Sequence, residues 1–143
     1  MKVLSVRQPW TWLIVNGFKN IENRVWYTNY RGELLIHAAL KLDPNIKQIR
    51  QLCESRGIVL PESFERGGIV GRAMLVDCVM SHPSVWFNGP YGLVLSAGCP
   101  LEFQKLRGCL GLFNFESAIE ADRLETDRRV NRSQSIAQRP LFP

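Results

Sequence analysis

The sequence predicts an α+β fold: a small, mostly antiparallel β-barrel with two main flanking helices and a polar C-terminal tail. Five to seven short segments have strand character, and two helical segments are inserted among them. Because strands and helices do not alternate regularly, this order is not typical of a parallel sheet. A chain of 143 residues with 45% hydrophobic residues is long enough for one domain with its own core. We expect the barrel in residues 1–115 and a charged, partly helical and mobile tail in residues 116–143.

The first elements are a strand at residues 3–6 and a helix that begins near Pro9 and stops at Gly17. From Asn20 onward the side-chain period changes to two. Glu22 and Arg24 then share one face of a strand with Trp26.

The middle of the chain begins with an apolar, central strand at residues 33–39. Asp43 is expected to cap a helix whose first residue is Pro44 and which Gly57 ends. The longest strand is expected at residues 67–80, and a loop follows at residues 81–90.

The remaining elements are short. Separate strands are expected at residues 91–97, 100–103 and 111–115. A charged helix could occupy residues 118–129, and the polar residues 131–139 are expected to be mobile.

The net charge of +5 lies on the predicted barrel, because residues 1–115 hold 13 Lys and Arg against 8 Asp and Glu. This excess permits a polyanionic partner, and ordinary solubilising charge explains it equally well. The four cysteines form no Cys-x-x-Cys pair and only two histidines occur, so neither a metal nor another cofactor is expected. Without an apolar span or a visible leader, we expect a cytoplasmic protein with no membrane contact.

Lys19, Glu22 and Arg24 form the densest charge cluster near aromatic residues. Lys19 could simply stabilise the C-terminal end of a helix, and Glu22 with Arg24 could be a surface ion pair. If the strand is a barrel wall, however, the three charges lie near an aromatic mouth and need a partner or a ligand.

Aromatic and polar residues inside the predicted elements also have two interpretations. Trp10 and Trp26 are expected in the core, whereas the loop residue Trp86 could stack on a nucleobase or fold back over the barrel. Asp77 and His37 are expected to be satisfied core groups.

A set of short motifs resembles the ASCH domain family. The first two are SVRQPW at residues 5–10 and Gly-x-Lys-x-x-Glu-x-Arg at residues 17–24. Further matching stretches occupy residues 31–38, 67–71, 77–78, 89–92 and 107–113, so the resemblance covers residues 3–115.

This resemblance implies a PUA-like β-barrel, a superfamily whose members bind RNA or hold a single, sometimes modified, base. It also implies that Lys19, Glu22 and Arg24 line a central cleft, with Arg7 and Gln8 beside them. A cation and an acceptor near aromatic rings suit a phosphate, a base edge and a stacked base. The expected partner is therefore single-stranded RNA, a nucleoside or a nucleotide, with RNA against DNA left open.

Some relatives implied by the resemblance are hydrolases. Small bacterial acetylcytidine amidohydrolases share the Gly-x-Lys start, yet they carry a catalytic threonine where this chain has Glu22. Lys19 and Glu22 could still act as a catalytic acid/base pair on a bound water. Hydrolysis of a modified nucleoside or of RNA is therefore the rival hypothesis to simple binding.

The C-terminus, QRPLFP, suggests a third hypothesis for the function. Gln138, Leu141 and Phe142 resemble the peptide by which bacterial proteins bind the replication sliding clamp. The alternative is a frayed end that docks loosely on its own barrel. A clamp-binding tail would make the protein an adaptor.

Overall fold

The computed structural model describes residues 1–137, and side chains as far as residue 134. Six strands form one curled sheet in the order β2-β5-β4-β3-β1-β6. Their bounds are β1 Lys2–Val6, β2 Ile21–Arg24, β3 Gly32–Ala38, β4 Gly68–Val79, β5 Tyr91–Lys105 and β6 Leu112–Asn114. Three helices accompany them: α1 Trp10–Val15, α2 Ile46–Ser55 and α3 Phe115–Ala137. The small α+β, barrel-like fold predicted from the sequence is confirmed.

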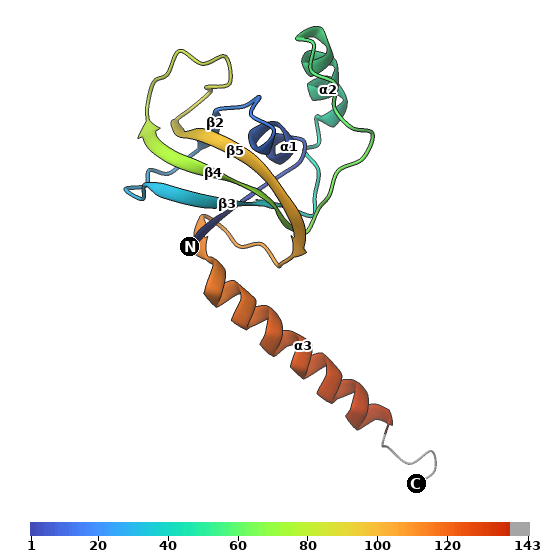
Figure 1. The fold of residues 1–143 in the computed structure, drawn as a ribbon. Coiled ribbons are helices and arrows are strands. Elements are labelled where there is room, and N and C mark those ends of the chain that lie inside the picture. Colours follow the sequence, from blue (N-terminus) through green and yellow to red (C-terminus); the bar gives the residue numbers. More distant parts are fainter. Residues whose placement is uncertain (138–143) are drawn as a thin grey trace.

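The sheet is mostly antiparallel, with β1 and β3 as its parallel pair. Helix α1 packs against β3, β4 and β5 and fills the curl of the sheet (Figure 1). Two glycines make this approach possible. A Cβ atom at Gly71 would collide with Val15, and one at Gly98 would collide with the backbone of Ile14.

Strand β5 differs from the prediction, because the expected strands at 91–97 and 100–103 are one strand of 15 residues. It is longer than β4, which has 12 residues and was expected to be the longest. The chain bends within β5 at Ala97, whose φ is +52°, and continues beside β4 after shifts of register. Because β5 bends where it packs against α1, residues 91–97 and 100–103 form one strand, although the local sequence pattern separates them.

Two other predictions need correction. Helix α2 begins at Ile46 rather than at Pro44, because Asp43 Oδ1 accepts a hydrogen bond from Asn45 N and forms a turn before the helix. Asp77 is exposed on β4 and lies 3.5 Å from Arg31, so it is not a core group.

Helix α3 is longer than expected, because it includes residues 131–137 of the segment predicted to be mobile. Its first turns pack on the barrel through Phe115, Ala118 and Ile119. The rest projects away from the barrel (Figure 1). None of the helices in residues 1–137 is long and apolar enough to cross a membrane.

Candidate functional site

A pocket of about 310 Å³ opens between α1, β2, the end of α2 and the loop at residues 81–90. It combines two tryptophan rings with charged side chains. The lining residues are Trp10, Lys19, Glu22, Asn23, Leu52, Arg56, Val85, Trp86 and Asn88.

Two charged groups at the wall of this pocket, Lys19 and Glu22, are bonded to each other, and Arg24 joins them from behind the wall. Lys19 Nζ donates to Glu22 Oε1 at 2.7 Å, and Arg24 Nη2 donates to Glu22 Oε2 at 3.1 Å. The side chains of Lys19 and Glu22 are only 4% and 10% exposed. Lys19 Nζ also lies 5.2 Å from the centre of the Trp10 ring, within the range of a cation–π contact.

The local backbone explains how these charges meet. Helix α1 ends in a turn in which the N–H groups of Phe18 and Lys19 both donate to Leu13 O. Gly17 permits this turn, because its φ is +82°. Strand β2 begins two residues after Lys19 and places Glu22 and Arg24 on one face.

Arg24 supports Glu22 from outside the pocket lining. Its Nη2 also donates to Ser5 O at 2.9 Å, and its guanidinium lies 5.9 Å from the centre of the Trp26 ring. The Nε atom of Arg24 is buried without a hydrogen-bond partner among the described residues. Arg24 therefore holds the Glu22 carboxylate in place rather than facing the pocket itself.

The opposite wall is the loop that carries Trp86, and Asn23 holds it. Asn23 Nδ2 donates to Trp86 O at 2.9 Å, while its Oδ1 accepts from the N–H groups of Asn88 and Gly89. Trp86 Nε1 donates to Phe18 O, so its ring is available to a ligand as a surface rather than as a donor. The loop thus folds back over the barrel and still presents Trp86 to the pocket.

Arg56 adds an exposed cation to the rim. It follows the last residue of α2 and lies 5.2 Å from the centre of the Trp86 ring. A guanidinium can both stack on an aromatic ring and bind a phosphate through two donors. Sequence reasoning missed Arg56, Asn23 and Asn88 because nothing in the local pattern joins α2 and the loop to β2.

The structure does not place Arg7 and Gln8 at the pocket. Arg7 is exposed, and Gln8 is buried with both ends of its amide engaged. Gln8 Oε1 accepts from Trp12 N in the first turn of α1, and Gln8 Nε2 donates to Glu65 O. Gln8 therefore fixes the start of α1 and ties it to the segment before β4.

A second hollow, of about 820 Å³, lies between the barrel and the first half of α3. Ser5 and His37 line it, and the hydroxyl of Ser5 lies 2.9 Å from His37 Nδ1. His37 Nε2 faces Leu106 O, which can only accept, so Nε2 carries the proton and Nδ1 accepts from Ser5. Burial lowers the pKa of His37 below its ordinary value of 6.5, although the Leu106 bond and Asp122 oppose this. His37 is a satisfied core group, as expected.

Within residues 1–137, no group of three or more His, Cys, Asp or Glu could hold a metal ion. The proposed partner-binding residues Gln138, Leu141 and Phe142 lie outside the described residues. Their role stays a prediction from the sequence.

The comparison with protein families matches the ASCH domain model to residues 4–124. The chain belongs to the ASCH domain family. It is also similar to activating signal cointegrator 1 of Homo sapiens, with 35% identity over 82 residues that cover 53% of this chain. The Mus musculus protein of the same name is 34% identical over 82 residues. The match spans only 14% of the length of these two relatives.

Proposed function

We propose that this ASCH domain binds single-stranded RNA, or a nucleoside or nucleotide, with one base in the pocket between Lys19 and Trp86. The observation that carries the proposal is the nearly buried Lys19–Glu22 pair on the wall of an open pocket lined by tryptophan. Buried charges are costly, and a site that retains them beside aromatic surface is suited to a polar, planar ligand.

The groups in the pocket match the parts of a nucleotide. The ring of Trp86 offers a stacking surface, and base–aromatic stacking contributes about 1–3 kcal/mol per base. Lys19 and Glu22 supply a donor and an acceptor for a base edge. Arg56, which rests on Trp86 in the free protein, would move to a phosphate as the base takes its place.

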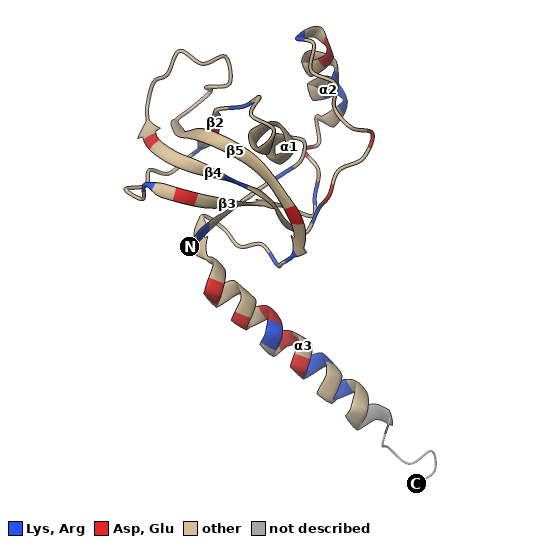
Figure 2. Ribbon diagram, in the orientation of Figure 1, with Lys and Arg blue, Asp and Glu red and all other residues tan. Residues whose placement is uncertain are grey.

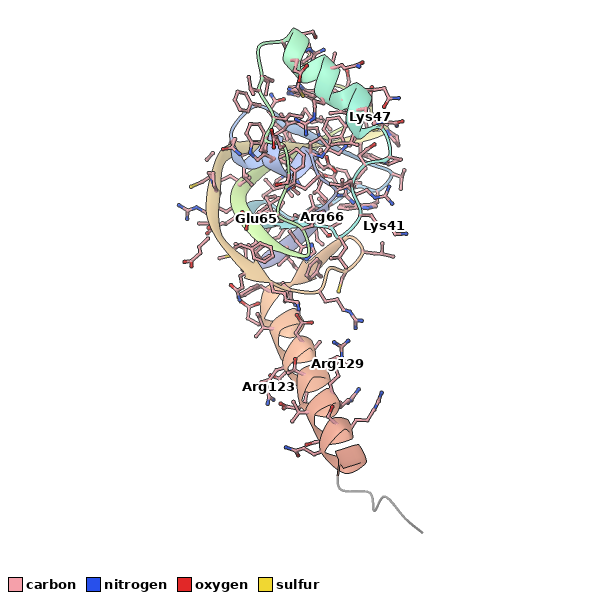
Figure 3. All side chains as sticks on the ribbon, turned by 90° about the vertical axis from the view of Figure 1, so that its right-hand side faces the viewer. Lys41, Lys47, Glu65, Arg66, Arg123 and Arg129 are labelled. Atoms are coloured by element: carbon pink, nitrogen blue, oxygen red, sulfur yellow. The ribbon has the colours of Figure 1, made fainter. Side chains whose placement is uncertain are left out.

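Further cations lie outside the pocket lining. Lys41, Lys47 and Arg66 lie on one side of the molecule, between α2 and the rim of the barrel, and the acidic Glu65 lies next to Arg66 (Figure 3). Phosphate contacts release counterions, so binding should weaken as salt is raised.

Fluorescence anisotropy with labelled single-stranded RNA, over a series of salt concentrations, tests the proposal. Trp86→Ala should weaken binding at least tenfold, while Trp86→Phe should retain most of it because a ring remains. Trp26→Phe is the matched control, since Trp26 does not line the pocket. Equal affinity for RNA in wild type and Trp86→Ala would reject this pocket as the site.

A hydrolase is the second candidate function, and the short Lys19–Glu22 hydrogen bond favours it. A lysine and a carboxylate in contact can exchange a proton with a bound water, which is the first requirement of general acid–base catalysis. Incubation of the protein with acylated nucleosides and with RNA, followed by chromatography, separates the two functions. Turnover in wild type that is lost in Glu22→Gln, under conditions in which the variant is folded, would support the enzyme, and intact substrates would support binding alone.

A further inference from the structure

Most of α3 has no neighbour among the described residues beyond its first turns, and it extends from the barrel as a single helix (Figure 1). Its two halves carry opposite charge (Figure 2). Residues 116–127 contain five acidic residues and one arginine, whereas residues 128–134 contain three arginines and no acid. The two halves of this helix are therefore electrostatically complementary.

Four of these charges share one face. Asp122, Glu125, Arg129 and Arg132 are spaced by three, four and three residues, which places them in one row along a helix. The row runs from acidic near the barrel to basic far from it. Within it, Arg129 Nε lies 3.2 Å from Glu125 Oε1, an ion pair inside the helix that a second chain would have to exchange for pairs between the helices.

The same face borders the hollow between α3 and the barrel. Asp122, Glu125 and Arg129 line this groove on the helix side. On the barrel side it includes Leu40 and Leu110, whose exposed fractions are 74% and 98%. Exposed leucines beside a charged row are typical of a surface that another chain covers.

We propose that this face of α3 binds the same face of a second copy of the chain, with the two helices antiparallel. In this register Asp122 lies opposite Arg132, and Glu125 lies opposite Arg129. A two-fold axis repeats each pair, so four interhelical ion pairs form from one self-complementary surface. A parallel arrangement would instead place like charges opposite each other.

The lengths of the elements agree with this register. Position 118 of one chain lies opposite position 136 of the other, so the second helix reaches the point where α3 leaves the barrel. There it covers the groove and the exposed Leu40 and Leu110. Acidic residues near the start and basic residues near the end of α3 also complement the dipole of a single helix. The dipole, however, does not explain why the four charges share one face of the helix or why that face borders an apolar groove.

Sedimentation equilibrium of the whole chain at low and high salt tests the proposal. Wild type should form a dimer that dissociates as salt screens the ion pairs. Asp122→Arg/Glu125→Arg makes the row entirely basic, and Arg129→Glu/Arg132→Glu makes it entirely acidic. Each variant should be monomeric alone, and an equimolar mixture should form a heterodimer.

The control variant is Glu120→Arg/Asp127→Arg, which changes the same net charge on the opposite side of α3 and should remain dimeric. Because Asp122 also accepts a hydrogen bond from Arg107 N, Glu125→Arg alone serves as a second test, with helix content monitored by circular dichroism. A monomeric wild type at every concentration would overturn the proposal. The proposal would also be overturned if the two oppositely charged variants, both folded, failed to associate. Binding of RNA by the basic half of α3 would not rescue it.

Discussion

Lys19 and Glu22 form a 2.7 Å ion pair that is almost entirely buried and yet lies on the wall of an open pocket. The contact depends on the tight turn after α1, which brings residues 19 and 22 onto the same side of the chain. Arg24 and the ring of Trp10 complete the surroundings of the pair. Such a group of charges is expensive to bury, and each member depends on the others.

The pair should therefore behave non-additively on mutation. Glu22→Gln should lower the free energy of unfolding by about 3–5 kcal/mol, because it leaves the buried Lys19 charge without its partner. Lys19→Met should cost less, because Glu22 keeps its ion pair with Arg24. The double variant should lose clearly less than the sum of the two. Urea denaturation of the four proteins measures this coupling. Strict additivity would show that the two charges do not interact in solution.

Gln8 should matter for stability and not for the ligand. Gln8→Ala removes the hydrogen bonds to Trp12 N and Glu65 O, two contacts made by a side chain that is 2% exposed. We expect a loss of about 1–3 kcal/mol in the free energy of unfolding. RNA affinity, measured where the variant is still folded, should stay within twofold of wild type. A large loss of affinity with unchanged stability would place Gln8 in the ligand site after all.

The sequence pattern predicts one wall of the pocket and not the other. Alternation along residues 20–26 places Glu22 and Arg24 on a common face, because a strand has a period of two. Arg56 and Trp86 form the opposite wall of the pocket. They lie far from Glu22 in the sequence, and a local sequence pattern does not predict contacts between distant residues. The hydrogen bonds from Asn23 to the Trp86 loop join residues more than 60 positions apart.

Family resemblance and local geometry also answer different questions. The SVRQPW motif correctly indicates the family, and within it Gln8 Oε1 accepts from Trp12 N in the first turn of α1, while Arg7 is exposed outside the pocket lining. A family motif does not by itself say which of its residues face a ligand. Similarly, β5 could not be predicted as one strand, because its bend at Ala97 follows the packing of α1 rather than any turn signal.

The clamp hypothesis for the C-terminus can be tested on the whole chain. If Gln138, Leu141 and Phe142 form a clamp-binding motif, wild type should bind a bacterial sliding clamp weakly, since two apolar anchors supply a few kcal/mol. Leu141→Ala/Phe142→Ala should abolish binding, while Lys19→Met should leave it unchanged. Surface plasmon resonance with immobilised clamp provides the measurement. Equal responses from wild type and the tail variant would exclude this motif.

His37 should make the stability of the domain depend on pH. Burial lowers the pKa of His37 in the folded protein below its ordinary value of 6.5, so the unfolded chain takes up the proton first as pH falls. The stabilising contribution of neutral His37 is therefore complete above pH 6.5 and decreases as pH falls below it. Protonation would also prevent Nδ1 from accepting the Ser5 hydroxyl. The urea midpoint of wild type should fall between pH 7.5 and pH 5.5, and this fall should be smaller in His37→Gln, whose neutral amide can still donate to Leu106 O. An identical pH dependence in both proteins would show that another group is responsible.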